Sequence, residues 1–288
     1  MTAAPRIALS PSAWGISDAP GSGYQPSAAQ VLGEVAKLGV KAIEAGPQGF
    51  LPDHSGQARR LLKRNRMTVA AGPVRAILHH HDIRAAELAH IDGHAAWLSA
   101  LGAETLVLIA IPTRDADQHR TPLSSTGWAH LLHSIGSVEH VCSRHHLRVA
   151  VQSEFGSMIH GPGEIETLLV GSEAGICIDT AQLMLGGADP LDVLELAAGR
   201  VRYVRLADID LGTADLVVRG DTTYGDAVRQ DLFKPLGTGD AKIERIVETV
   251  RQSDYKGWYA IDEPKYAQSD QAHPNVRQSV DFLFSLLA

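Results

Sequence analysis

Short apolar runs alternate with longer amphipathic stretches along the whole chain. Eight of these runs are rich in Val, Ile and Ala and show no strict alternation of polar and apolar positions; they cover 6–10, 41–45, 68–72, 105–111, 148–152, 175–179, 201–206 and 257–262. Parallel strands that are covered on both faces have this pattern. We therefore predict eight buried strands.

The stretches between the runs have helical periodicity; they cover 28–39, 56–66, 84–102, 128–145, 163–171, 190–199, 242–253 and 275–287. Two buried stripes stand out at three- and four-residue spacing: Ala58, Leu61 and Leu62, and Ile243, Ile246, Val247 and Val250. Eight strands alternating with eight helices predict an α/β fold, a (β/α)8 TIM barrel that forms a single domain over residues 1–288. An open doubly wound sheet is the alternative, but its GxGxxG sign is absent, since the GSG at 21–23 follows no strand directly.

Composition narrows the class of protein. The formal net charge of −7 argues against nucleic acid as a partner, because phosphate binding needs a basic surface. The sequence contains no run of about 18 apolar residues, so it predicts no membrane-spanning segment. The first residues do not resemble a signal peptide, and the two cysteines, Cys142 and Cys177, form no CxxC pair. We expect a cytoplasmic protein with a small-molecule substrate, and its oligomeric state stays open.

Polar side chains mark the C-terminal ends of the predicted strands, where a barrel of this kind carries its site. They are Trp14 after the first strand, Glu44 at the second, Gln152, Glu154 and His160 at and after the fifth, Asp179 and Gln182 at the sixth, Arg205 and Asp208 at the seventh, and Asp262, Glu263 and Lys265 at the eighth. Clustered carboxylates repel one another unless a cation lies among them. The cation is either a divalent metal or the guanidinium of Arg205. The long connection at about 208–240 is expected to shape the pocket.

Six stretches carry a resemblance to a known family: SPSAWGI, AIEAGPQGFLP, CIDTAQLMLGGADPL, RVRYVRLADID, AVRQDLFKPLGTGD and GWYAIDEP. They resemble the xylose-isomerase-like TIM barrels of the sugar phosphate isomerase/epimerase superfamily, and most of all its inosose dehydratase branch. The likeness runs from about residue 6 to 287. It implies a divalent metal, manganese or cobalt, held by carboxylates and histidines, which polarises a carbonyl or hydroxyl while a base takes a neighbouring proton.

The sequence departs from the ligand set that this resemblance implies. The carboxylate or His at the end of the fifth strand falls on Gln152, with Glu154 two residues on. Asp179 is retained in the sixth strand, but its His partner is Gln182. The seventh-strand His falls on Arg205, and the last-strand Glu is either Asp262 or Glu263. Arg has no lone pair to offer a metal, and the loss of both imidazoles removes the favoured nitrogen donors.

Our hypothesis is that Arg205 replaces the metal, pairs with Asp179 and with Glu154 or Asp262, and binds a substrate oxygen. No cofactor is then needed. The alternative is a metal-dependent isomerase, epimerase or dehydratase that holds Mn, Co or Mg in an all-oxygen site of Glu154, Asp179 and Asp262.

The function that follows is a lyase (dehydratase) or an isomerase/epimerase for a small sugar- or cyclitol-like keto substrate. Arg205 stabilises an enolate oxygen, Glu154 or Glu263 is the base, and Lys265 or His160 is the acid. The expected substrate contacts are Trp14, Glu44, Gln152, Asp179, Gln182 and Asp208.

Structural interpretations stay open beside these roles: Arg205 with Asp179 as a space-filling ion pair, Glu44 as a partner of backbone N–H groups, and Trp14 as a packing residue. The rival function is a non-catalytic barrel that binds a polyol-like ligand or a protein.

Overall fold

The computed structural model describes residues 5–17, 25–114, 120–265 and 274–288, so the GSG at 21–23 lies outside the described residues. The strands that correspond to the eight predicted runs are β1 Ile7–Leu9, β2 Ala42–Ile43, β3 Thr68–Val69 with β4 Ala71–Ala76, β5 Thr105–Ala110, β6 Arg148–Gln152, β7 Ile176–Asp179, β8 Val201–Leu206 and β11 Tyr259–Ile261. All eight predicted strands are present. The third is divided, because Ala70 separates β3 from β4, and β4 continues to Ala76 beyond the predicted end at 72.

These strands form one sheet in the order β3-β2-β1-β11-β8-β7-β6-β5-β4. Pairings within it are parallel, for example Leu9 with Ile261 of β11 and Val107 with Ala150 of β6. The divided third strand supplies both ends of the order. This is the strand order of a (β/α)8 barrel, which confirms the predicted fold class.

The chain divides into two compact units, Met1–Ala70 with Val204–Ala288, and Ala71–Tyr203. The core of the first unit includes Leu9, Ile43 and Leu206, and that of the second includes Leu106 and Leu108, all with no exposed surface. That residues 1–288 form a single domain stays a prediction.

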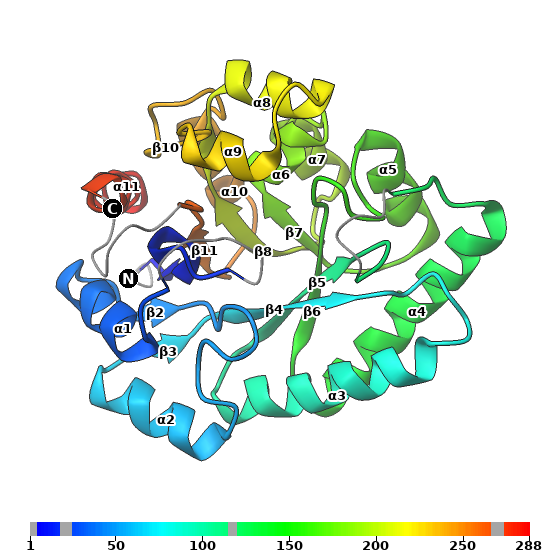
Figure 1. Ribbon diagram of the computed structural model, residues 1–288, viewed down its shortest axis with the longest axis horizontal. Coiled ribbons are helices and arrows are strands. Elements are labelled where there is room, and N and C mark those ends of the chain that lie inside the picture. Colours follow the sequence, from blue (N-terminus) through cyan, green and yellow to red (C-terminus); the bar gives the residue numbers. More distant parts are fainter. Residues whose placement is uncertain (1–4, 18–24, 115–119, 266–273) are drawn as a thin grey trace. The chain divides into compact units, whose positions relative to one another are not determined.

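The helices follow the strands as expected (Figure 1); they are α1 Ala28–Lys37, α2 Ser55–Arg64, α3 Arg84–Ala100, α4 Ser125–Arg144, α5 Pro162–Gly171, α7 Pro190–Leu196, α10 Ile243–Gln252 and α11 Pro274–Leu287. In the second unit α3 packs on α4, and α4 packs on β6. The predicted stripe of α10 is fully buried, whereas Leu61 of α2 is only half-buried. Two short helices come directly after strands and were not predicted: η1 Pro11–Trp14 and α6 Thr180–Leu185.

The long connection after β8 has its own structure. It contains β9 Asp208–Ile209, α8 Leu211–Arg219, α9 Tyr224–Arg229 and β10 Phe233–Lys234. β9 pairs antiparallel with β10, and α8 packs on α9. Asp240, which precedes α10, accepts a hydrogen bond from the N–H of Leu211 at the start of α8.

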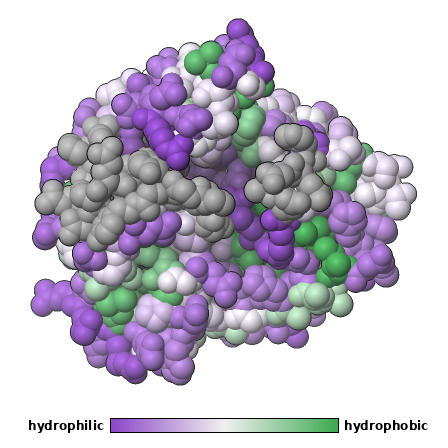
Figure 2. Space-filling model, viewed as in Figure 1, coloured by the Kyte–Doolittle hydropathy of each residue, from purple (hydrophilic) through white to green (hydrophobic). Residues whose placement is uncertain are grey.

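Exposed apolar side chains are few and scattered. Leu211, Leu216 and Val218 of α8 are exposed, and Figure 2 shows small apolar patches within a mostly hydrophilic surface. Single exposed apolar residues are normal on a folded protein. Among the described residues, no helix is both long enough and apolar enough to cross a bilayer.

Candidate functional site

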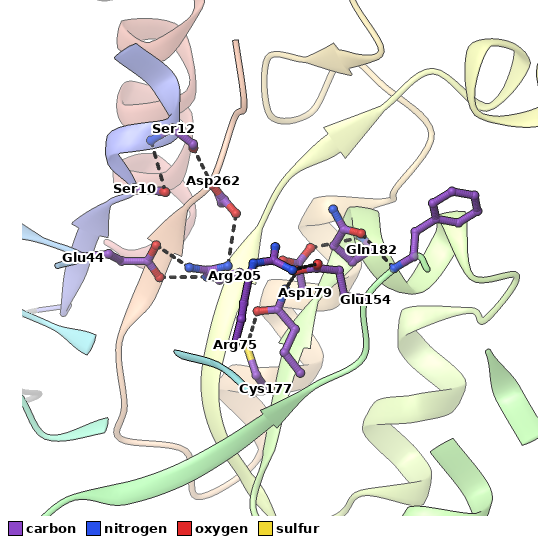
Figure 3. Close-up of polar contacts among 12 residues, drawn as sticks. Ser10, Ser12, Glu44, Arg75, Glu154, Cys177, Asp179, Gln182, Arg205 and Asp262 are labelled. Carbon is purple, nitrogen blue, oxygen red and sulfur yellow. Dashed lines mark hydrogen bonds and ion pairs between the residues drawn. The ribbon is translucent and has the colours of Figure 1, made fainter. Parts of the chain in front are cut away.

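Arg205 of β8 binds two carboxylates that follow other strands of the first unit. Its Nε donates to Glu44 Oε1 at 2.8 Å and its Nη2 donates to Glu44 Oε2 at 2.7 Å. Its Nη1 lies 3.5 Å from Asp262 Oδ2. Glu44 follows β2 and Asp262 follows β11, so three strand ends meet at one guanidinium (Figure 3).

The backbone ladder places these side chains. Glu44 N–H donates to Leu9 O of β1, and Asp262 N–H donates to Leu206 O of β8, so that the parallel pairing continues one residue past each assigned strand. Side chains alternate along an extended strand, and Arg205 therefore lies on the opposite face of β8 from Leu206. The local strand geometry is enough to bring Glu44 and Asp262 to the same side as Arg205.

The cluster is almost dry. The side chain of Arg205 is 9% exposed, that of Glu44 is 1% exposed and that of Asp262 is 13% exposed. Burial of a charge is tolerated only where it is paired and hydrogen-bonded, and the bidentate geometry does this for Glu44.

Ser12 fixes the other oxygen of Asp262. Its Oγ donates to Asp262 Oδ1 at 2.5 Å, while Asp262 Oδ2 faces Arg205. Ser12 belongs to η1, whose N-cap Ser10 accepts from the N–H of Ser12, and the Ser12 carbonyl accepts from the N–H of Lys265. The loop after β1 and the end of β11 thus hold Asp262 in one orientation.

The second unit carries another carboxylate–guanidinium pair. Glu154, which follows β6, has its Oε1 at 2.6 Å from Nη1 of Arg75 on β4. Its Oε2 accepts from Gln152 Nε2 at 3.3 Å, and Gln152 Oε1 accepts from the thiol of Cys177 at 3.8 Å. Figure 3 shows Arg75 beside the Glu154 carboxylate. Arg75 was missed by the sequence analysis.

Hydrogen bonds close the loop after Glu154. His160 Nδ1 accepts from Gly156 N–H at 2.8 Å, and Gln182 Oε1 accepts from Phe155 N–H at 3.1 Å. Asp179 Oδ1 in turn accepts from Gln182 N–H at 3.1 Å and is the N-cap of α6. These contacts give Asp179, Gln182 and His160 structural roles, and their roles toward a substrate stay predictions.

The surroundings of His160 lower its pKa. Burial lowers its pKa, and the positive charge of Arg120 lowers the pKa further. Because Nδ1 accepts a backbone N–H, the ring hydrogen lies on Nε2. A neutral imidazole of this kind donates a hydrogen bond.

Asp208, a predicted substrate contact, is hydrogen-bonded to nearby backbone groups. Its carboxylate accepts backbone N–H groups from Gly237 and Gly239 on Oδ2, and from Ala241 and Ile209 on Oδ1. The side chain is fully buried. Four donors engage the two oxygens, so Asp208 organises the connection after β10, and its role toward a substrate stays a prediction.

Glu263 and Lys265 are also engaged inside the first unit. Glu263 is fully buried and accepts from Ser279 Oγ of α11, and that hydroxyl accepts from the N–H of Leu236. Burial raises the pKa of Glu263 to about 7. Since side chains alternate, Glu263 lies opposite Asp262 on the extended chain after β11, which assigns Asp262 and not Glu263 to the cluster of Arg205.

Lys265 lies against the hairpin of β9 and β10. Its Nζ donates to Phe233 O at 2.9 Å and is 3.7 Å from Asp231 Oδ1. Burial lowers the pKa of this ammonium, and the charges of Glu263 and Asp231 oppose that change.

Trp14 is a core residue of the first unit. It has no exposed surface, and its Nε1 has no hydrogen-bond partner within the described part of the chain. Complete burial agrees with the interpretation of Trp14 as a packing residue.

One predicted partner of Arg205 is confirmed, because Asp262 lies 3.5 Å from its guanidinium. Arg205 also binds Glu44, which was expected as a substrate contact or as a partner of backbone N–H groups. Pairing of Arg205 with Asp179 or Glu154 stays a prediction.

The residues at the implied metal position do not fit a resident metal ion. Arg205 places a permanent positive charge between Glu44 and Asp262, and Glu154 is already paired with Arg75. Within residues 5–17, 25–114, 120–265 and 274–288, no group of three or more His, Cys, Asp or Glu side chains is placed to hold a metal.

Comparison with known proteins decides the family. The family model described as "Xylose isomerase-like TIM barrel" matches residues 32–286. The chain belongs to this family. The resemblance stated from the sequence is thereby confirmed.

Relatives and solved structures agree with this membership. The inosose dehydratase of Geobacillus kaustophilus (strain HTA426) is 24% identical over 282 residues, which cover 93% of this chain and 90% of the relative. The D-psicose 3-epimerase of Clostridium cellulolyticum H10, solved with D-tagatose, superposes with a TM-score of 0.71 at 14% identity and covers 98% of this chain and 99% of its own. The IOLI protein, solved with a bound zinc atom, superposes with a TM-score of 0.69 at 10% identity, with 98% of both chains covered. At these identities the structures show the fold alone.

Proposed function

We propose that the chain is a dehydratase or an isomerase/epimerase for a small sugar- or cyclitol-like keto substrate, and that Arg205 takes the place of the metal. Relatives named inosose dehydratase and structural neighbours that are sugar epimerases support the substrate class and the type of reaction. The observation that carries the proposal is the guanidinium of Arg205, fixed by Glu44 and Asp262 at three strand ends.

The reaction begins with removal of a proton from the carbon beside the substrate carbonyl. The electrons of the broken C–H bond form a carbon–carbon double bond, and the carbonyl oxygen gains the negative charge of an enolate. In a dehydration, the enolate collapses, the C–O bond at the next carbon breaks, and the hydroxide leaves as water with a proton from an acid. In an isomerisation or epimerisation, the proton returns to carbon instead.

Arg205 suits the charge that develops on the enolate oxygen. A guanidinium is permanently charged and is pre-organised here by bonds to two fixed carboxylates, so little reorganisation is needed as the oxygen becomes negative. One such donor contributes on the order of 3 kcal/mol to transition-state stabilisation in enzymes of known mechanism.

Glu154 is our candidate for the base, and its carboxylate is held in an ion pair with Arg75. Glu263 is not retained as a base, because it is buried against Ser279. Lys265 and His160 stay the two candidate proton donors. The variants Lys265→Met and His160→Gln show which of the two is the donor. The variant without the true donor should no longer release water but should still exchange the proton at carbon.

The first experiment asks whether the protein needs a metal. Purified protein is analysed for manganese, cobalt, zinc and magnesium, and is then assayed with inosose, D-tagatose and D-psicose by NMR in D2O before and after treatment with EDTA. We expect conversion or deuterium incorporation that survives chelation. Near-stoichiometric metal, lost together with activity on chelation, would overturn the metal-free part of the proposal.

The same samples separate an enzyme from a ligand-binding barrel. Inosose that raises the melting temperature without loss of water, epimerisation or deuterium incorporation indicates binding without catalysis. That result contradicts the proposed chemistry.

A further inference from the structure

The ion pair between Arg75 and Glu154 joins an otherwise apolar strand of the second unit to the loop after β6. Arg75 is the one charged residue of β4, whose other residues are Ala, Gly, Pro and Val. Glu154 comes directly after β6 and Ser153, in a short loop whose backbone bonds join Glu154 N–H to Ile159 O and Ser157 N–H to Glu154 O. A strand end and a tight loop therefore present a guanidinium and a carboxylate to each other at 2.6 Å.

This pair gives the fold little stability. The side chain of Arg75 is 40% exposed, and an ion pair with one partner so exposed contributes little, because water screens it. Stability therefore does not explain an arginine in an otherwise apolar strand.

Both oxygens of the Glu154 carboxylate have a partner that fixes their position. Oε1 meets Arg75, and Oε2 accepts from the amide of Gln152, which is 1% exposed. That amide cannot turn over without loss of both contacts, because its oxygen accepts from the thiol of Cys177 and its nitrogen donates to Glu154. Arg75 is the more exposed of the two groups that fix the carboxylate.

We propose that Arg75 is a positioning residue, which holds the Glu154 carboxylate in the orientation needed for proton abstraction. This inference rests on the proposed function of Glu154 as the base. It predicts that loss of the guanidinium lowers the rate of the chemical step while the fold and substrate affinity are largely kept.

The test compares Arg75→Met and Arg75→Lys with the control Arg114→Met. Arg114 is a matched control in the same unit, because its Nη2 donates to both oxygens of Glu87 at 2.9 and 2.8 Å and its side chain is 54% exposed. For inosose, we expect Arg75→Met to lower kcat by about 30-fold with KM changed less than about threefold, since small misplacements of a catalytic group have effects on the order of 100-fold. Arg75→Lys should recover part of the loss, and Arg114→Met should match the unaltered protein.

A second readout does not need a substrate. In protein labelled with ¹³C at glutamate carboxylates, the signal of Glu154 is identified by its loss in Glu154→Gln. We expect this signal to move in Arg75→Met and to stay in place in Arg114→Met. If it stays in place in Arg75→Met, or if kcat equals that of Arg114→Met, the inference is overturned.

The two readouts also separate this inference from the proposed function. If the unaltered protein converts none of the substrates, the proposed function fails. The carboxylate signal then still decides whether Arg75 orients Glu154.

Discussion

Arg205 holds Glu44 through both oxygens of the carboxylate, at 2.8 and 2.7 Å, across 161 residues of sequence. The two side chains are 9% and 1% exposed. A buried pair of this geometry stabilises a fold only as long as both partners are present, because either charge left alone is strongly unfavourable in a dry environment.

The contribution of Arg205 to stability can therefore be measured separately from its contribution to turnover. Arg205→Met leaves the buried Glu44 carboxylate without its guanidinium, and we expect a loss of about 3–5 kcal/mol in the free energy of unfolding. The double variant Arg205→Met with Glu44→Leu removes both charges and should recover most of that loss. Urea unfolding measures the stabilities. Turnover should be lost in the single and the double variant, and a double variant that keeps turnover would contradict the role of Arg205.

Asp208 provides a test of the connection after β8. Asp208→Asn replaces one acceptor oxygen by a donor, which then faces backbone N–H groups that had been satisfied by the carboxylate. We expect a loss of about 2 kcal/mol or more, in the range for buried donors left without an acceptor. Asp215→Asn is the control, because Asp215 is an exposed residue of α8 whose pair with Arg219 spans 3.6 Å. An equal change in the two variants, measured by urea unfolding, would argue against the cage of four N–H donors.

Glu263 makes stability depend on pH. Its pKa is raised by burial to about 7 in the folded protein, from the ordinary value of 4.5. The folded state therefore binds its proton more tightly than the unfolded state does, and stability falls as pH rises from about 4.5 to 7. Across this window, the loss is on the order of 3 kcal/mol.

Glu263→Gln removes the titratable carboxyl group and keeps the shape of the side chain. We expect the variant to be more stable than the unaltered protein at pH 8.5 and similar to it at pH 5. The exposed Glu248 of α10 supplies the control Glu248→Gln. Melting temperatures over this pH range check the prediction, and parallel curves for all three proteins would rule out Glu263 as the cause.

Gly46 supports the position of Glu44. Its φ of +69° lies in the left-handed region, and a Cβ there would lie 2.8 Å from Pro11 Cγ and 2.9 Å from Phe50 Cδ1. We expect Gly46→Ala to lower stability by about 1–3 kcal/mol and to reduce turnover through displacement of the strand end. Gly33→Ala in α1 should instead raise stability by about 0.5–1 kcal/mol, because its Cβ meets nothing within 4 Å. Thermal unfolding of both variants compares the two outcomes.

The strand order could be predicted because buried parallel strands have a distinct pattern, from RIALS at 6–10 to GWYAID at 257–262. The candidate site could be predicted as a set of strand-end residues, and Arg205 with Asp262 came from that set. The pairing of Arg205 with Glu44 could not be predicted from the sequence. It depends on which strands are neighbours in the sheet and on the orientation of the side chain at the end of each strand.

Arg75 was missed for a specific reason. The third strand was expected over 68–72, which leaves Arg75 outside it. The structure carries β4 through Pro73 to Ala76, which makes Arg75 a strand-end residue. The continuing sequence VRAI at 74–77 was the available signal.

Asp208 has a consequence for what the turn at 236–241 can recognise. Backbone amides that point to one centre form a nest suited to phosphate or another anion. Here the chain supplies its own anion to that nest. A phosphorylated ligand would find these amides occupied, and added salt would weaken the turn little, because mobile ions screen a buried charge poorly.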